Sequence, residues 1–190
     1  DSHRRQRQMC IRDRLYGGTI NLMGKSFRKF GWNAVFVDND NPEAFRAAVT
    51  EKTRAIFVES LANPGGVIVD LEAIAKIAQE AEVPLIVDNT MATPWLCRPF
   101  EWGADLVVHS TTKFLSGQGN AMGGIVIDSG RFPWFGNAKY PSLSEPCPDY
   151  NGLTFAETFG DMAFTLYSHA VSLRDIGCTQ SPMNAWITLN

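Results

Sequence analysis

From Trp32 onward, short apolar runs alternate with longer amphipathic segments. The short runs are rich in β-branched and aromatic residues, which favour strands. Strands are predicted at Ala34–Asp38, Arg54–Ser60, Pro84–Asn89, Asp105–Ser110 and Gly123–Ser129. Because these runs are almost wholly apolar before their last residues, we expect both faces of the sheet to be covered.

Two segments between these runs carry signals for the start of a helix. Asn41 is followed by Pro42, which is a cap residue followed by proline at the first helical position. Asp70 precedes a segment whose Leu71 and Ile74 fall on one helical face. Strands separated by helices predict an α/β fold with a mostly parallel sheet flanked by helices.

The pattern divides the chain into three parts. The first part is arginine-rich and lacks periodicity, and the last contains a predicted long helix over Thr154–Ile176 and a helix start near Pro182. The predicted parts are a disordered or foreign leader at 1–14, an α/β domain core at 15–150 that ends in an irregular linker, and a linker helix with the start of a further domain at 151–190. The residue composition and hydrophobic pattern at both ends favour a chain that lacks its true N-terminus and its C-terminal domain.

Composition and charge exclude some classes of protein. The chain is 45% hydrophobic and 19% charged with a net charge of −3, which is ordinary for a globular protein and argues against a nucleic-acid surface. No apolar run approaches the roughly 20 residues that span a bilayer. The four cysteines are far apart and form no CxxC pair, which predicts free thiols and a cytoplasmic location.

Polar residues gather where the predicted strands end, which is the edge of a parallel sheet where ligands bind. They are Glu59 and Asn63, Asp88 and Asn89, and Ser110, Thr112 and Lys113. Taken singly, each has an ordinary interpretation as a turn, a cap or a solvated side chain. Together they bring an acid, an amide, hydroxyls and an amine to one edge. Whether Glu59 orients a site or caps a turn stays open.

This set of groups suits a pyridine aldehyde phosphate. A partly desolvated lysine amine forms a Schiff base with the aldehyde. An aspartate keeps the ring nitrogen protonated, which makes the ring an electron sink. An amide bonds the ring oxygen, while hydroxyls and backbone N–H groups bind phosphate.

The motifs "LYGGT", "ESLANPGG", "PLIVDNT" and "HSTTKFLSGQG" resemble those of the Cys/Met-metabolism family of pyridoxal-phosphate enzymes, which have an aspartate-aminotransferase-like fold. The resemblance extends from about Leu15 to Asn190 and implies pyridoxal 5'-phosphate as cofactor. It implies roles for Lys113 as the Schiff-base lysine, Asp88 at the ring nitrogen, Ser110 and Thr112 at the phosphate, Asn63 at the ring oxygen, and Tyr16 stacked on the ring and assisting proton transfer.

Within the family, the segment "SEPCPDYNGLTFAETFG" is similar to that of O-acetylhomoserine sulfhydrylases. This resemblance implies γ-replacement, in which O-acetyl-L-homoserine and sulfide give L-homocysteine and acetate. It also implies a homo-oligomer of paired dimers. The family's substrate-carboxylate arginine would lie beyond Asn190, so we expect the isolated fragment to be weak or inactive.

Several alternatives stay open. The chain is also compatible with a methionine γ-lyase, a cystathionine γ-synthase or γ-lyase, or a non-catalytic fragment. A nucleotide-binding oxidoreductase is disfavoured because Gly117 and Gly119 open onto a strand, whereas the dinucleotide fingerprint opens a helix. The scattered histidines argue against a metal site. Cys97 is interpreted as a core or interface residue, since nothing near it in the sequence would lower its pKa.

Overall fold

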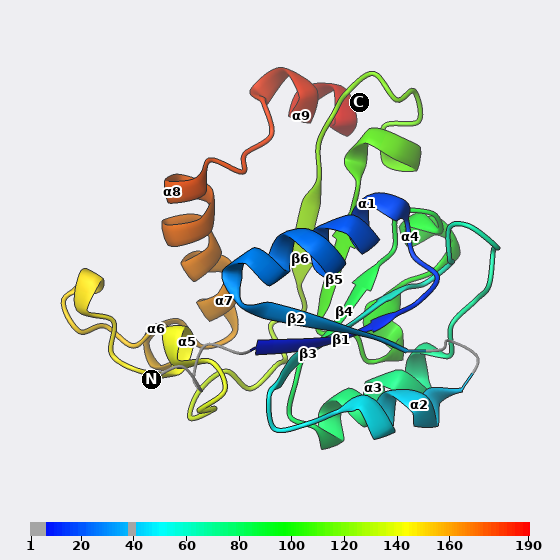
Figure 1. Ribbon diagram of the computed structural model, residues 1–190. Coiled ribbons are helices and arrows are strands. Elements are labelled where there is room, and N and C mark those ends of the chain that lie inside the picture. The colour runs from blue at the N-terminus through cyan, green and yellow to red at the C-terminus, as the bar shows by residue number, and fades with distance from the viewer. Residues whose placement is uncertain (1–6, 38–40) are drawn as a thin grey trace.

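The computed structural model describes residues 7–37 and 41–190. Its strands form a six-stranded sheet in the order β2-β1-β3-β4-β5-β6 (Figure 1). The bounds are β1 Arg7–Arg12, β2 Trp32–Val37, β3 Thr53–Glu59, β4 Leu85–Asp88, β5 Leu106–His109 and β6 Ile125–Asp128. Neighbouring strands run parallel, except that β6 is antiparallel to β5. The predicted mostly parallel sheet is therefore confirmed; Asp38, the predicted end of one strand, lies outside the described residues.

Helices and helical turns fill the connections. The α-helices are α1 Gly17–Asn21, α2 Pro42–Ala48, α3 Leu71–Glu80, α4 Thr93–Leu96, α5 Pro141–Ser144, α6 Phe155–Phe159, α7 Ala163–Tyr167, α8 Arg174–Ile176 and α9 Pro182–Leu189. Turns of 3-10 helix lie at Phe27–Phe30, Pro99–Trp102, Pro148–Tyr150 and Gly160–Met162, and π-helical turns at Leu22–Ser26, Thr111–Leu115 and Ser168–Leu173.

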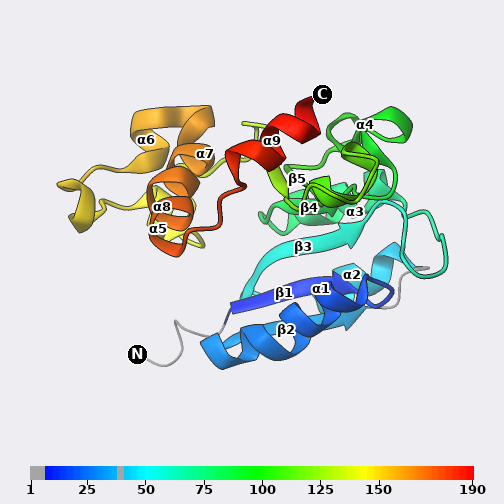
Figure 2. The ribbon, with the colours of Figure 1, turned by 90° about the horizontal axis from the view of Figure 1, so that it is seen from above.

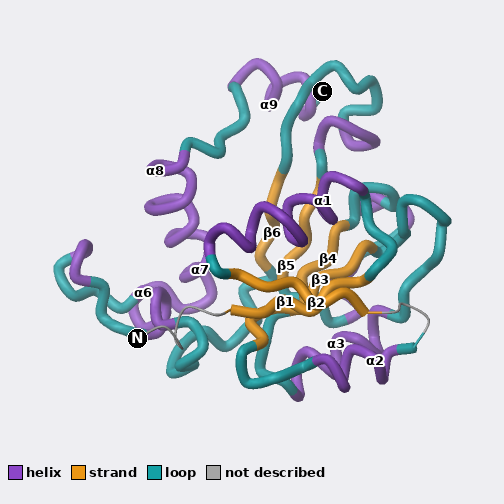
Figure 3. The backbone as a smooth tube through the Cα atoms, viewed as in Figure 1, coloured by secondary structure: helices purple, strands orange, loops and turns teal. Residues whose placement is uncertain are grey.

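Both faces of the central strands are covered, as the apolar strands predict, whereas the edge strand β6 is largely exposed. On one face, α2 and α3 bury Phe45, Ile74 and Ile77 against the strands. On the other, the segment that begins with α1 contributes Met23, which packs with Ile11 of β1 (Figures 1 and 3). This two-sided burial holds the strand ends at fixed positions, because close-packed cores resist displacement.

The two predicted helix caps are confirmed. The Asn41 side chain accepts a hydrogen bond of 2.9 Å from the Glu43 N–H, and the Asp70 side chain accepts one of 3.0 Å from the Ala73 N–H. Each bond satisfies a backbone donor that has no partner within the helix.

Residues 7–12 correct the prediction of disorder for the first 14 residues. They form β1, which lies between β2 and β3, and the Arg12 side chain at its end is 0% exposed. Its Nη1 donates to the carbonyl oxygens of Glu59, at 3.2 Å, and of Val67, at 3.4 Å. These partners are distant in sequence, which is why local periodicity misses the strand. Residues 1–6 lie outside the described residues, and a foreign origin of the segment stays a prediction.

The C-terminal part packs around a second, aromatic core (Figure 2). Trp134 stacks on Phe164 with ring centroids 5.5 Å apart, so this core draws on residues from both sides of position 150. The boundary predicted at 150 stays a prediction. The single helix predicted over Thr154–Ile176 is wrong in its first part: α6 ends at Phe159, and the chain breaks at Gly160, whose φ of 55° favours glycine. Beyond the break, α7, the π-helical turn Ser168–Leu173 and α8 follow one another without interruption to Ile176, as predicted. The helix start at Pro182 is confirmed.

Candidate functional site

The carboxyl ends of three neighbouring parallel strands lie level with one another. Glu59 at the end of β3 pairs in register with Asp88 at the end of β4, and Asp88 pairs with Val108 of β5. Ser110 follows β5 directly. The sheet therefore brings the predicted residues of three different segments to one edge.

Thr90 connects two of these residues. Its hydroxyl donates to Asp88 Oδ1 at 2.5 Å and accepts a hydrogen bond of 2.8 Å from the Ser110 N–H. The Thr90 N–H also donates to Asp88 Oδ1, at 2.9 Å. Asp88 and the start of the segment that leads to Lys113 are thus held together by one hydroxyl. Thr90 lies in the motif "PLIVDNT", but its role does not follow from the sequence, because its partner Ser110 is 20 residues away.

Glu59 connects two further predicted residues. Its side chain accepts hydrogen bonds from the Tyr16 N–H, at 2.7 Å, and from the Asn63 N–H, at 3.0 Å. Glu59 is only 4% exposed, and burial raises the pKa of its carboxyl group, with the nearby Asp88 acting in the same direction. The two backbone bonds and Arg12 oppose that rise.

Lys113 lies three residues beyond Ser110, in the π-helical turn Thr111–Leu115. Its backbone leaves the helical region, with φ −91° and ψ −117°, and its N–H donates to the Ser110 carbonyl oxygen at 3.3 Å. The residue is exposed, so its amine is open to a ligand. The short connection keeps Lys113 at the same edge of the sheet as Asp88.

Thr112 forms hydrogen bonds with the end of the glycine-containing loop that follows Lys113. The Thr112 hydroxyl accepts a hydrogen bond of 3.0 Å from the Gly123 N–H and lies 3.2 Å from the Gly123 carbonyl oxygen, to which it donates. A Cβ atom at Gly123 would lie 2.3 Å from Gln180 Nε2 and 2.7 Å from Thr111 Oγ1, so a larger residue there would require these side chains to shift. The predicted contact of Thr112 with phosphate stays a prediction.

Asn89 organises the edge from within the core. It is 0% exposed, accepts a hydrogen bond from Ser60 Oγ at 2.7 Å, and donates through Nδ2 to the Cys97 carbonyl oxygen at 2.9 Å. These bonds join the ends of β3 and β4 to the loop after α4. Asn89 is therefore a supporting residue, because its polar atoms are turned into the protein.

Two other titratable side chains near the edge have pKa values shifted toward their neutral forms. Burial lowers the pKa of His109, which favours its neutral form. Burial raises the pKa of Cys97, and Glu101 adds to the rise, so its thiol is a poor nucleophile, as the sequence predicts.

Within the described ranges, no group of three or more His, Cys, Asp or Glu residues could hold a metal ion. In the same part of the chain, no helix is long and apolar enough to cross a membrane.

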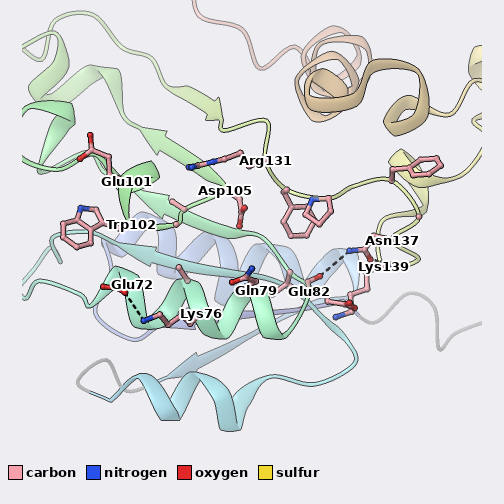
Figure 4. A pocket seen from close by; sticks show the side chains of 18 of the residues that line it. Glu72, Lys76, Gln79, Glu82, Glu101, Trp102, Asp105, Arg131, Asn137 and Lys139 are labelled. Carbon is pink, nitrogen blue, oxygen red and sulfur yellow. Dashed lines mark hydrogen bonds and ion pairs between the residues drawn. The ribbon is translucent and has the colours of Figure 1, made fainter.

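A wide hollow of about 1150 Å³ runs along α3 to the amino ends of β4 and β5 (Figure 4). Arg131, Lys139 and Asp105 line it, and none of the predicted site residues does. Arg131 Nη2 donates to the Phe100 carbonyl oxygen at 2.8 Å, and Lys139 Nζ to that of Ala81 at 2.5 Å. Because these cations already have backbone partners, the carboxyl ends of the strands are the better candidate for a functional site.

Known proteins resemble the chain at the level of both sequence and structure. An O-acetyl-L-homoserine sulfhydrylase of Leptospira meyeri is 48% identical over 180 residues, which are 90% of this chain and 40% of that protein. A Campylobacter jejuni structure described as an O-acetylhomoserine (thiol)-lyase, which contains a pyridoxyl-lysine phosphate, superposes with a TM-score of 0.93 at 36% identity, covering 96% of this chain and 45% of that one. The chain thus spans less than half the length of these relatives.

A cystathionine γ-lyase structure from Lactobacillus plantarum shares the fold at a TM-score of 0.71 and 27% identity, covering 96% of this chain and 39% of that one. The similarity to O-acetylhomoserine enzymes is therefore the stronger one. The model of the family described as Cys/Met metabolism PLP-dependent enzyme matches residues 4–190. The chain belongs to this family of pyridoxal-phosphate enzymes.

Proposed function

We propose that the chain supplies the cofactor-binding part of an enzyme that makes L-homocysteine and acetate from O-acetyl-L-homoserine and sulfide. The observation that carries this proposal is the hydrogen-bonded series Asp88–Thr90–Ser110 beside the exposed Lys113. A carboxylate, hydroxyls and an amine at one strand edge suit a pyridoxal phosphate, because they match its ring nitrogen, phosphate and aldehyde.

Each residue of the site has a proposed task. Lys113 holds the aldehyde carbon, and Asp88 accepts a hydrogen bond from the ring nitrogen. Ser110 and Thr112 bind phosphate oxygens, Asn63 bonds the ring oxygen, and Tyr16 lies against the ring face. The Tyr16 side chain is 53% exposed, which leaves its aromatic face accessible to such a ligand.

The proposed reaction removes one proton from the α-carbon and one from the β-carbon, exchanges one substituent at the γ-carbon, and returns both protons. The bound cofactor supplies an electron sink for the charge that develops at the substrate's α-carbon. The Lys113 amine, once released by the substrate amine, removes the α-proton as general base. Loss of a β-proton then lets acetate leave with the electron pair of the C–O bond. Sulfide adds at the γ-carbon, and the protons return to the α- and β-carbons.

Labelling of the lysine tests the cofactor assignment. The purified protein would be incubated with pyridoxal phosphate, its visible absorption recorded, the sample reduced with borohydride and the modified peptide mapped. We expect a single label on Lys113. Absence of a band, or a label spread over surface lysines such as Lys76, would contradict the proposed site.

Product analysis separates the substrate classes. With O-acetyl-L-homoserine, a sulfhydrylase forms homocysteine only when sulfide is added. A γ-lyase such as a methionine γ-lyase would form ammonia and an oxo acid without sulfide, and a γ-synthase would prefer cysteine as the thiol. Cofactor binding without any product would favour a non-catalytic chain.

We also propose that the protein is a homo-oligomer and acts in the cytoplasm. Trp95 is 91% exposed and Leu96 is 74% exposed, and large apolar side chains at such exposure are typical of surfaces that are covered in an assembly. The four cysteines are unpaired, which suits a reducing compartment. Analytical ultracentrifugation would test the first point, and a monomer at micromolar concentration would contradict it.

A further inference from the structure

The buried carboxylate of Glu59 connects two segments that are far apart in sequence. Oε1 accepts a hydrogen bond of 2.7 Å from the Tyr16 N–H, and Oε2 accepts one of 3.0 Å from the Asn63 N–H. Tyr16 precedes α1, and Asn63 begins the turn after β3. Each oxygen therefore holds a different segment, and each segment contains a residue that we assign to the cofactor.

These two contacts differ in kind. The bond to Asn63 spans four residues and is what a carboxylate that caps a turn would make. The bond to Tyr16 spans 43 residues, so turn capping does not account for it. Both interpretations that the sequence leaves open for Glu59 therefore apply, one to each oxygen.

The absence of a side chain at Gly18 leaves room for the Tyr16 ring. A Cβ atom at Gly18 would lie 2.7 Å from Tyr16 Cε1, so the ring occupies the space that a side chain at Gly18 would need. The backbone of Tyr16 is held by Glu59 and its ring lies over Gly18. The ring position thus depends on the Glu59 carboxylate, because that carboxylate holds the start of the segment.

Burial of a carboxylate is unfavourable unless hydrogen bonds and charges compensate for it. At Glu59 the compensation comes from the two N–H groups and from Arg12. The neighbouring Asp88 makes burial of a second acid still less favourable. A neutral side chain would fill the same space with a smaller desolvation penalty. It could not, however, accept equally strong hydrogen bonds from two separate backbone amides.

We propose that Glu59 is a positioning residue that sets the Tyr16 ring and the Asn63 amide relative to Asp88, so that they meet the two sides of the same cofactor ring. This inference rests on the proposed function. Glu59 itself acts through Tyr16 and Asn63.

The test replaces Glu59 by glutamine. Gln has one acceptor oxygen, and its amide nitrogen would face a backbone N–H, so one of the two bonds is lost. We expect the apparent Kd for pyridoxal phosphate to rise about tenfold, as loss of one hydrogen bond to a charged acceptor implies. At saturating cofactor, the visible circular dichroism of the bound ring should change, because that signal reports the groups that surround the ring.

The matched control is Asp105→Asn. The Asp105 carboxylate also accepts a backbone hydrogen bond, from the Leu85 N–H at 2.8 Å, but it lies at the opposite end of the strands. We expect this variant to bind pyridoxal phosphate with unchanged Kd and dichroism. A general loss of stability would affect both variants alike, so the contrast isolates positioning.

A double-mutant cycle with Tyr16→Ala gives a second measure. If Glu59 acts through the Tyr16 ring, Glu59→Gln should change the Kd less in the Tyr16→Ala background than in the wild type. Additive effects, or a Glu59→Gln protein with wild-type Kd and dichroism, would overturn the proposal. If Glu59→Gln does not fold, Glu59→Asp is used, which keeps the charge but shortens the reach.

Failure of this inference is distinguishable from failure of the proposed function. If wild-type protein carries no label on Lys113, the proposed function fails and the role of Glu59 fails with it. If the wild type is labelled on Lys113 and Glu59→Gln is indistinguishable from it, only the role of Glu59 fails.

Discussion

The two ends of the sheet use similar polar groups for different purposes. At the amino ends, Asp105 accepts a hydrogen bond from the Leu85 N–H, while Lys139 and Arg131 donate to backbone carbonyls. These side chains complete the hydrogen bonding of nearby loops. Their charged atoms are occupied by the fold, although the hollow that they line is large.

At the carboxyl ends, the polar side chains connect candidate functional residues to one another. Glu59 holds Tyr16 and Asn63, and Thr90 holds Asp88 and the Ser110 N–H. The comparison teaches that the size of a hollow is a weaker guide to function than the way its polar groups are bonded. A site is better recognised where buried groups position other groups that stay exposed.

Replacement of Lys113 should have the largest effect. Lys113→Ala removes both the amine that holds the cofactor and the proposed general base, so turnover of O-acetyl-L-homoserine with sulfide should fall about a thousandfold or more. The matched control is Lys76→Ala on α3, which loses only an exposed ion pair with Glu72. Activity retained by Lys113→Ala would refute the assignment.

Replacement of Asp88 should have the next largest effect. Asp88→Asn keeps the shape but loses the negative charge opposite the ring nitrogen, and a hydrogen bond to a charged group is worth about 1.5–3 kcal/mol. We therefore expect kcat to fall about 10- to 100-fold while pyridoxal phosphate still labels Lys113. Steady-state kinetics at saturating cofactor would measure this. A kcat equal to that of the wild type would mean that Asp88 does not contact the ring nitrogen.

The sequence predicts those parts of the fold that depend on local pattern. The central strands follow from their apolar runs, and α2 and α3 follow from the caps at Asn41 and Asp70, because cap and helix are adjacent in the chain. β1 could not be predicted in this way. The burial of Arg12 in it depends on carbonyl oxygens of Glu59 and Val67, which only the folded chain brings near.

The same distinction applies to the candidate site. Lys113 and Asp88 could be proposed from residue type and position at strand ends. The roles of Thr90 and Glu59 could not, because each is defined by a partner from another part of the chain: Ser110 for Thr90 and Tyr16 for Glu59. The sequence thus reveals reactive groups more easily than it reveals the groups that hold them in place.

Thr90→Val should have an intermediate effect. Valine matches threonine in shape but cannot accept from the Ser110 N–H or donate to Asp88. Because these groups are half-buried, their loss of a partner should cost about 1 kcal/mol, the low end for a buried polar group. We expect a lower free energy of unfolding and weaker binding of pyridoxal phosphate, measured by urea denaturation and cofactor titration. Thr90→Ser keeps the hydroxyl and should restore most of both. Equal losses in Thr90→Ser and Thr90→Val would show that the methyl group, and not the hydroxyl, matters.

The smallest expected effect is the pH dependence that Asp105 contributes at the amino ends. Burial raises the pKa of Asp105 above its ordinary value of 3.8, so the folded state binds the Asp105 proton more tightly than the unfolded state does. The destabilisation from this group is therefore absent below the ordinary pKa and grows as pH rises through the raised pKa. Asp105→Asn does not titrate, so its stability relative to the wild type should increase as pH rises from about 4 to about 7. Urea denaturation midpoints of the two proteins across this range would measure the difference. A relative loss of stability of Asp105→Asn with rising pH would mean that the pKa of Asp105 is lowered, and that the Leu85 N–H outweighs burial at this end of the sheet.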